Sequence, residues 1–408
     1  MPDKPYYPWI IVATTLVNQA FSVGILIYSF ALFVVPWLDE FGISRGRMML
    51  AIVALQMVVG FVSPTIGRLL DTRSLRLMVL LGALSTGAGL GLLSQVTAFW
   101  QVMLIHATLL PLGMVLCGTL ASQTLVSKWF AEKRGLAIGI SATGTSLGGF
   151  VFPLVTAQLL ATYEWHGTLL IHALLCIAVL IPLNFFILQV PPPTAEPHST
   201  NGTDGTHHPT QSWNTREILA TRMFWIPIIG LIPINAAFGG VQFNLGALMS
   251  DLNMSQDFAA ILISITSVSM IVGKLLFGML GDRVEHRPLF WLMFGLMAAA
   301  LWMYIGTPGR FELITAATLQ GLATGGVLPM MGVTYSSRFG TLAFGKVLGL
   351  VNLFLMTGSF GSILSGWMFD LTGSYDTAFW TFLVLLIPAT VALYWLPPAQ
   401  NMSRPGHA

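Results

Sequence analysis

The sequence contains little charge. Only 8% of its 408 residues are Asp, Glu, Lys or Arg, whereas 55% are hydrophobic. Soluble proteins typically contain about 25% charged and 45–50% apolar residues. The net charge of +2 is small and scattered, so the composition gives no sign of a nucleic-acid partner. This deficit of charge predicts an integral membrane protein that lies in a lipid bilayer.

Cysteine is also scarce, and no pattern typical of catalysis or of a metal site occurs. Cys117 and Cys176 lie inside apolar runs, which favours buried packing residues over a disulfide. His207 and His208 are adjacent in a polar loop, but two imidazoles without further ligands are more typical of a solvated loop than of a metal site. There is no phosphate-binding glycine loop and no nucleophile elbow. We therefore expect no enzyme, no cofactor and no metal.

The apolar residues fall into runs that are long enough to cross about 30 Å of hydrocarbon as helices. The first run begins at Trp9 and is too long for a signal-peptide core, so we expect it to remain as a span. Short charged turns separate the runs. The sequence predicts twelve spans, near residues 9–36, 48–70, 77–94, 100–127, 135–162, 167–189, 223–249, 258–281, 289–306, 312–336, 344–369 and 377–396.

The positions of the basic residues predict how these spans cross the membrane, because Lys and Arg concentrate in cytoplasmic loops. With the N-terminus inside, the outer turns hold only Arg45, Arg47 and Arg310, and Lys274 lies within a span. The rest of the 18 basic residues then lie on the inner side. We therefore expect both termini in the cytoplasm and the protein in the plasma membrane, which is the inner membrane if the cell is bacterial.

One long polar loop divides the spans into two sets of six. Its residues, 191–212, are rich in Pro, Thr, Gly and His and offer nothing from which to build a core. We expect a six-helix bundle over 1–190, a cytoplasmic linker over 191–222 and a second six-helix bundle over 223–408. The fold class is thus an all-α membrane protein in two pseudo-symmetric halves.

The two halves share a short turn motif. Gly67-Arg-Leu-Leu-Asp71 follows the second span, and Gly278-Met-Leu-Gly-Asp282 follows the eighth. Glycine allows close helix approach, and the carboxylate can accept from backbone N–H groups at the start of a neighbouring helix. The alternative is that Asp71 and Asp282 are ordinary turn residues whose carboxylates are solvated by water. Parallel repeats of this kind place a substrate site at the midplane between the halves.

Lys274 is the one charged residue within an apolar run. An ammonium in hydrocarbon costs roughly 2.5–3.5 kcal/mol, so an unpaired one usually faces a cavity or a ligand. The alternative is a lysine that extends to the interface, because Asp282 is only about eight residues, or ~12 Å, away. Helical spacing places Lys274 on one stripe with Ser264, Ser267, Gly278 and Gly281. The apolar stripe roughly opposite contains Leu262, Ile265, Val272, Leu276 and Met279.

The twelve spans, the central linker and the doubled turn resemble the major facilitator superfamily over essentially the whole chain. Two stretches are similar to the monocarboxylate transporters, particularly their prokaryotic relatives. One closes the first span and runs from Tyr28 to Arg45 as YSFALFVVPWLDEFGISR. The other opens the fifth span and runs from Trp129 to Gly149 as WFAEKRGLAIGISATGTSLGG. The resemblance implies two halves that rock around a central substrate site.

The same resemblance assigns a role to Lys274. In that family an arginine of the eighth span commonly holds the substrate carboxylate, and Lys274 occupies its place. Met270 stands where the animal members have an aspartate. The oxalate and formate exchangers use a second cation in the eleventh span, and residues 347–369 contain none. The resemblance therefore implies a substrate with one carboxylate.

Further candidates come from the spans that line the cavity in this superfamily. For substrate binding they are Tyr28, Asn235, Gln242 and Gln320, although a single amide is more often an interhelical hydrogen bond. For proton coupling they are Lys274, His106 and His172, although each histidine is more typical of packing. The resemblance also implies a cytoplasmic conformational latch made of Asp71, Arg73, Asp282 and Arg283.

Together these features predict a secondary transporter of a small organic monocarboxylate, coupled to protons and present as a monomer. Within the class, the alternatives are a carboxylate exchanger and a facilitator of another organic solute, in which Lys274 only bridges helices. A non-transporting sensor that keeps the fold is an alternative from another class. An intramembrane enzyme is disfavoured, because every acid lies in a loop or at the end of a span.

Overall fold

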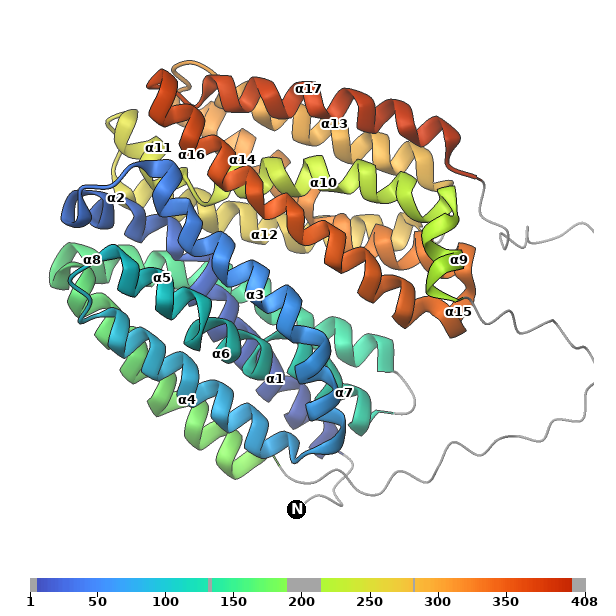
Figure 1. The fold of residues 1–408 in the computed structure, drawn as a ribbon, viewed down its shortest axis with the longest axis horizontal. Coiled ribbons are helices and arrows are strands. Elements are labelled where there is room, and N and C mark those ends of the chain that lie inside the picture. Colours follow the sequence, from blue (N-terminus) through green and yellow to red (C-terminus); the bar gives the residue numbers. More distant parts are fainter. Residues whose placement is uncertain (1–5, 131–133, 189–213, 282, 398–408) are drawn as a thin grey trace, which may run out of the picture.

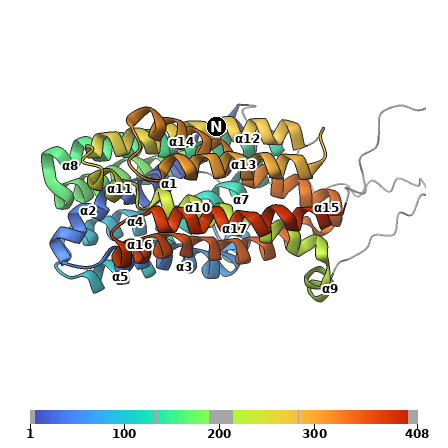
Figure 2. The ribbon, with the colours of Figure 1, turned by 90° about the horizontal axis from the view of Figure 1, so that it is seen from above.

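The structure is a computed structural model that describes residues 6–130, 134–188, 214–281 and 283–397, with the backbone alone described at 71, 134–135 and 340–346. These residues form helices joined by short turns, without strands. Long helices run roughly along one direction in both views of the ribbon (Figures 1 and 2). This parallel arrangement is expected of helices that span one bilayer.

The first half of the chain contains eight α-helices. The first predicted span is made of α1, a π-helical turn at Gly24–Tyr28 and α2. The fourth is divided among α5, α6 and α7. The bounds are α1 Tyr7–Val23, α2 Phe30–Phe41, α3 Arg45–Thr72, α4 Leu75–Leu93, α5 Phe99–Ala107, α6 Leu109–Cys117, α7 Thr119–Trp129 and α8 Arg134–Ile187.

The second half contains the remaining helices. A short helix, α9, lies within the predicted linker, and α15 continues from the tenth predicted span into the eleventh. The bounds are α9 Thr215–Ala220, α10 Arg222–Gln242, α11 Leu245–Asp251, α12 Gln256–Gly281, α13 His286–Tyr304, α14 Arg310–Gly325, α15 Val327–Leu355, α16 Phe360–Thr372 and α17 Asp376–Ala392, with 3₁₀ turns at Met356–Ser359 and Leu393–Trp395.

The predicted all-α membrane fold is confirmed. Eleven helical stretches among the described residues are long and apolar enough to cross a membrane. One of them, Leu136–Ile187, covers most of both the fifth and the sixth predicted spans. The helix α8 breaks at Glu164, whose φ of 53° and ψ of −174° are not helical. This break lies between the predicted spans 135–162 and 167–189, so all twelve are accounted for.

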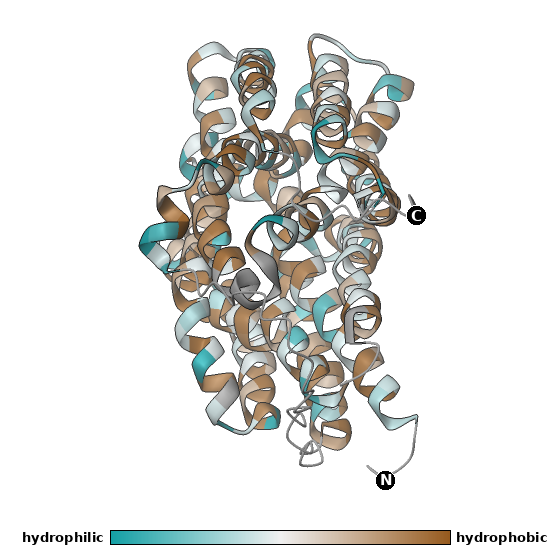
Figure 3. Cartoon of the chain, turned by 90° about the vertical axis from the view of Figure 1, so that its right-hand side faces the viewer, coloured by the Kyte–Doolittle hydropathy of each residue, from teal (hydrophilic) through white to brown (hydrophobic). Residues whose placement is uncertain are grey.

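The outward side chains agree with a lipid environment. Large apolar residues lie on the surface of many helices, and Phe61, Phe186 and Phe311 are 64%, 73% and 80% exposed. Hydrophobic residues occur on helices all round the assembly when it is viewed along the helices (Figure 3). Such surfaces would be unfavourable in water, whereas acyl chains cover them in a bilayer.

The helices gather on two sides of a seam. In Figure 1, α1 to α8 lie below it and α10 to α17 lie above it. The helix α3 packs beside α16, and α8 packs beside α12 along the seam. The exact division into domains at residues 191–222 stays a prediction, since residues 189–213 lie outside the described part of the chain. The seam is where the candidate site lies.

Candidate functional site

Lys274 faces the first half of the chain. Its Nζ donates to Thr145 Oγ1 across 3.2 Å and to Ser146 Oγ across 3.0 Å, and both hydroxyls belong to α8. One stripe of α12 makes this interface, because Ser264 Oγ also donates to the Phe150 carbonyl across 2.8 Å. The serine and lysine part of the predicted stripe therefore packs against protein, and the ammonium joins α12 to α8.

The rest of the predicted stripe is placed differently. A Cβ added to Gly278 would lie near Pro329, and one added to Gly281 would lie near Val333. These glycines therefore face α15 and not α8. Leu262, expected on the opposite stripe, is fully buried. Val272 and Met279 of that stripe are exposed as expected, and Ile261, Val268 and Leu275 complete the exposed face of α12. The expectation therefore holds for part of each stripe, because the surrounding helices decide which faces remain uncovered.

The ammonium of Lys274 has no acidic neighbour in the described part of the chain. The ion pairs there are Arg45 with Asp251 and Arg287 with Glu285. Two neutral hydroxyls are weaker acceptors for an ammonium than a carboxylate is. A lysine in this setting can therefore bind an anion without first breaking an internal ion pair.

Tyr28 lies at the same interface, against Met270, which is one helical turn before Lys274 on α12. Its hydroxyl lies 3.2 Å from the sulfur of Met270, and the residue is 5% exposed. Gly149 of α8 makes this approach possible. A Cβ on Gly149 would lie 2.3 Å from Ser267 Oγ and 2.8 Å from the Tyr28 ring. The first span, α8 and α12 thus meet around Gly149.

Two of the predicted amides are buried without hydrogen-bond partners. Gln242 on α10 and Gln320 on α14 are each 1% exposed, and neither the oxygen nor the nitrogen of either amide has a partner among the described residues. An unpaired buried polar group costs about 1–3 kcal/mol. Such a cost in a folded protein indicates that the group has another role, such as binding water or a ligand.

Asn235 differs from these two amides. Its Nδ2 donates to the Leu231 carbonyl of its own helix across 3.0 Å. Its Cβ lies 2.6 Å from the position of a Cβ on Gly358, so the residue packs against the 3₁₀ turn before α16. The structure therefore brings Lys274 and Tyr28 to one interface, whereas it links none of the three amides to Lys274 by a hydrogen bond.

The two histidines have separate surroundings. His106 Nδ1 lies 2.9 Å from the Val102 carbonyl of its own helix, and its ring packs edge-on to Phe30 and Trp37. The buried position and the aromatic neighbours are those of a packing residue. No hydrogen bond connects its ring to Lys274 within the described structure.

His172 is part of a buried chain of hydrogen bonds. Thr156 Oγ1 donates to Ser29 Oγ across 2.9 Å, and Ser29 Oγ donates to the Gly24 carbonyl across 3.1 Å. Since the single proton of Thr156 is used, His172 Nε2 donates to Thr156 Oγ1, 2.9 Å away. His172 Nδ1 has no partner among the described residues. This chain holds the π-helical turn that ends at Tyr28.

The predicted cytoplasmic latch falls mostly outside the described residues. Asp282 and the side chain of Asp71 are not described. Arg73 is the exposed residue after α3, and Arg283 is exposed just beyond α12. Both arginines therefore lie at helix ends, and the pairing of the latch stays a prediction.

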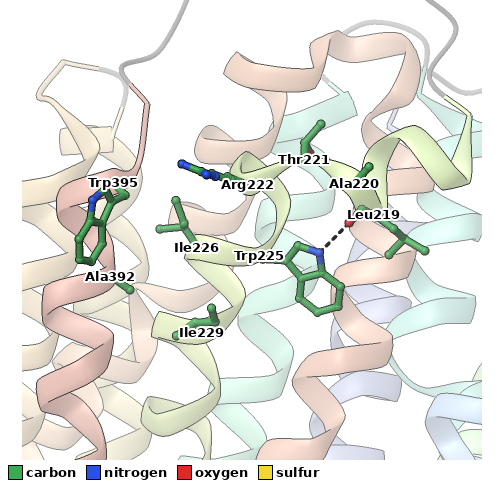
Figure 4. A pocket seen from close by; sticks show the side chains of 9 residues that line it. All are labelled: Leu219, Ala220, Thr221, Arg222, Trp225, Ile226, Ile229, Ala392 and Trp395. Atoms are coloured by element: carbon green, nitrogen blue, oxygen red, sulfur yellow. Dashed lines mark hydrogen bonds between the residues drawn. The ribbon is translucent and has the colours of Figure 1, made fainter.

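Two hollows on the surface are lined by residues other than the predicted ones. Figure 4 shows one between α9, α10 and α17, where Arg222 and Trp395 lie near Ile226 and Ala392. A second hollow, between α2, α8 and α12, is lined by the acids Asp39, Glu40, Glu164 and Asp257 among others. Neither includes Lys274.

Sequence reasoning missed one set of polar contacts across the seam, around Arg45. The sequence showed only that Arg45 is one of three basic residues in the outer turns and that it ends the family-like stretch from Tyr28. Its acidic partner, Asp251, is distant in the chain, so only the folded structure brings the two together.

Comparison with known proteins identifies the family of the fold. The sequence profile of the Major Facilitator Superfamily matches residues 17–246 and 234–407. Monocarboxylate transporter 13 of Bos taurus is 27% identical over 99% of this chain and 92% of its own length. The oxalate:formate antiporter of Oxalobacter formigenes is 24% identical over 77% of this chain and 73% of its own.

A solved structure agrees with the overall arrangement. The crystal structure of a bacterial homolog of the human lysosomal transporter Spinster, inward-facing and unoccupied, has a TM-score of 0.73 against this chain. It covers 97% of both chains at 14% sequence identity. At this identity the likeness concerns the fold alone.

Proposed function

Because the chain belongs to the Major Facilitator Superfamily, we propose that it is a secondary transporter of a small organic monocarboxylate in which Lys274 binds the substrate carboxylate. The observation that carries the proposal is the position of the ammonium. It lies at the seam between the first and second halves, where only neutral hydroxyls accept from it among the described residues. The names of the two relatives describe a monocarboxylate transporter and an oxalate:formate antiporter, which supports a carboxylate as the substrate.

Binding follows from the strengths of the hydrogen bonds. A carboxylate brings a full negative charge to the ammonium, whereas a hydroxyl oxygen brings only a dipole, so the carboxylate displaces Thr145 or Ser146 from Lys274. Tyr28, which contacts Met270 one turn before Lys274, supplies a hydroxyl for a second polar group or an aromatic face for the substrate's apolar part. The unpaired amides Gln242 and Gln320 are proposed to bind polar atoms of the substrate or the water that accompanies it.

A substrate bound to Lys274 would link binding to movement of the two halves. Lys274 belongs to α12 and its present acceptors to α8, so a substrate that takes the ammonium changes a contact between the two sides of the seam. In transporters built from repeats, such a change lets the halves rock about a site near the midplane. Transport by alternating access is therefore proposed for this chain.

Proton coupling is proposed on energetic grounds. Moving an anion against a negative-inside potential costs about 2.3 kcal/mol per 100 mV, so an accompanying proton makes uptake electroneutral. Lys274 is the proposed carrier: protonated when it pairs with the carboxylate, and neutral when the empty site returns. Exchange of one carboxylate for another is the alternative, which the antiporter among the relatives favours.

Transport assays in proteoliposomes test the proposal. We expect labelled monocarboxylates to enter vesicles that contain the purified protein and not vesicles that contain the Lys274→Met variant. Neutral solutes serve as the comparison. Flux of a neutral solute that is unaffected by Lys274→Met would indicate a facilitator of another solute, and binding of carboxylates without flux would indicate a sensor.

A further inference from the structure

Arg45 makes several contacts from the first half to the second half at one end of the molecule. We name this the outer end, because the distribution of basic residues places it outside the cell. The Arg45 guanidinium donates to both carboxylate oxygens of Asp251, across 2.5 and 2.6 Å. It also donates to the Tyr375 hydroxyl across 2.9 Å and lies 3.6 Å from the centre of the Phe369 ring. One side chain thus binds α11, α16 and the turn before α17.

The geometry of the ion pair is favourable. Two parallel N–H···O bonds between a guanidinium and a carboxylate fix both groups, whereas single-point surface pairs contribute little. The side chains of Arg45 and Asp251 are only 15% and 31% exposed, so water competes less than at an open surface. The Phe369 ring beneath the guanidinium adds a cation–π contact.

A second carboxylate binds the backbone at the same place. The two oxygens of Asp370 accept from the N–H groups of Arg45 and Gly46, each across 2.9 Å. These are the first two N–H groups of α3, which have no acceptor within their own helix and form its positive end. Asp370 belongs to α16, so a residue of the second half caps a helix of the first half.

Glycines make this close approach possible. A Cβ on Gly366 would lie 2.8 Å from the Gly46 nitrogen, and a Cβ on Gly46 would lie 3.1 Å from the Trp367 backbone. On the neighbouring pair of helices, a Cβ on Gly246 of α11 would lie 2.2 Å from the Ala31 carbonyl of α2. The outer end is therefore closed at two places by backbone contact.

We propose that Arg45, Asp251 and Asp370 form an outer gate that holds this end closed and opens when the transporter exposes its site to the outside. Each contact joins the two sides of the seam, so every one must break when the outer ends separate. The gate rests on the proposed transport function, but it does not depend on which solute is carried.

The chain offers a matched control for Asp370. Asp376 lies at the same outer end, and its Oδ1 accepts from the Gly306 N–H across 2.9 Å. This contact is of the same kind, a carboxylate on a backbone N–H group. Both partners belong to the second half, so the contact does not have to break when the two halves separate.

Distance measurement by pulsed electron spin resonance tests the gate without any substrate. Spin labels are placed at Asp39 and Thr307, which are exposed at the outer end on opposite sides of the seam. The native Cys117 and Cys176 are buried and are kept in every variant. Protein without added cysteines is treated with the label to show that these two do not react. The distance distributions of wild type, Asp251→Asn, Asp370→Asn and Asp376→Asn are then compared in nanodiscs.

We expect the ratio of long to short distances to rise about fivefold in Asp251→Asn and in Asp370→Asn, and to stay at the wild-type value in Asp376→Asn. A single charged contact of roughly 1 kcal/mol corresponds to that factor. A distribution for either gate variant that coincides with the Asp376→Asn distribution would overturn the role of that residue. Failure of carboxylate transport with an intact shift would instead count against the proposed function and leave the gate contacts in place.

Cysteine accessibility gives a second readout. Ala31 is 1% exposed, and its carbonyl oxygen packs against Gly246 with no room for a Cβ there. An Ala31→Cys thiol should react with a membrane-impermeant maleimide several times faster when Asp370→Asn is added, and no faster when Asp376→Asn is added. Equal rates in the two backgrounds would contradict the gate.

Discussion

The Nζ atom of Lys274 lies 3.0 Å from the hydroxyl oxygen of Ser146, and this contact joins α12 to α8 across the seam of the molecule. The two residues are 128 positions apart in the chain. Ser264 and Tyr28 make further contacts at the same interface. Among the described residues, Lys274 donates only to neutral oxygens. The first two predictions rest on this observation.

Replacement of Lys274 by Met keeps the bulk of the side chain and removes its charge. If the ammonium binds the carboxylate, affinity should fall by roughly 2 kcal/mol or more, because hydrogen bonds to charged groups contribute about 1.5–3 kcal/mol. Isothermal titration with monocarboxylates measures the loss. Ser146→Ala, which removes only a present acceptor of the ammonium, is the control and should retain binding. Unchanged affinity of Lys274→Met for every carboxylate tested would rule out the assignment.

Replacement of Lys274 by Arg separates binding from proton release. Arginine binds a carboxylate well, but it does not deprotonate in proteins. Counterflow exchange, in which the site always returns loaded, should continue. Net uptake driven by a pH jump should be mostly lost. Both assays use one preparation of proteoliposomes, and net uptake at the wild-type rate would direct attention to His106 or His172 as the proton carrier.

Replacement of Gln320 by Leu tests the role of an amide that is buried without a partner. A purely structural amide of this kind lowers stability, so Leu should leave the thermal unfolding temperature unchanged or raise it. If the amide binds substrate, the stabilisation of the protein by added carboxylate should shrink in the same variant. Thermal unfolding with and without carboxylate measures both effects. Full ligand stabilisation in Gln320→Leu would remove this residue from the site.

Replacement of Gly149 by Ala should disturb the interface of the first span, α8 and α12. The added Cβ would lie 2.3 Å from Ser267 Oγ, and overpacking of this kind typically costs about 1–3 kcal/mol. Gly139→Ala in the same helix is the control, since nothing lies within 4 Å of its Cβ position. That variant should be neutral or slightly more stable, because Ala has the higher helix propensity. Equal unfolding temperatures for the two variants would contradict the packing described.

The predicted orientation in the membrane is tested by reporter tags. Tags at Gly202 and after His407 should lie in the cytoplasm, and a tag at Asp251 should lie outside, since basic residues concentrate in cytoplasmic loops. Protease protection of each tag in spheroplasts or intact cells gives the side. A tag at Gly202 that is exposed outside would reverse the topology and, with it, the name of the outer end.

Much of the fold could be predicted because it depends on local composition. The thickness of hydrocarbon and the rise of a helix set the length of a span, so runs of apolar residues mark the spans directly. The turn between the fifth and sixth spans was expected between 162 and 167, and the helix breaks at Glu164. Backbone groups in lipid must be hydrogen-bonded within the protein, and apolar runs of about 20 residues then fit helices and not the shorter strands of a barrel.

The site could be predicted only in part. Lys274 was identifiable because a charge in an apolar run is costly, whatever its partners are. Its acceptors, Thr145 and Ser146, were not identifiable, because hydroxyls are common in spans and carry no signal of which helix they face. Leu262 was expected opposite the lysine and is buried, since a neighbouring helix covers that face.

The sequence by itself determined the class of the protein, the positions of its spans and the one cation inside an apolar run, because each follows from the free energy of transferring residues into lipid. Tertiary structure alone decided that Arg45 meets Asp251 and that Asp370 caps α3. Those contacts depend on how two distant halves of the chain approach each other. That approach is set by glycines and shape along the whole seam, and no local pattern encodes it.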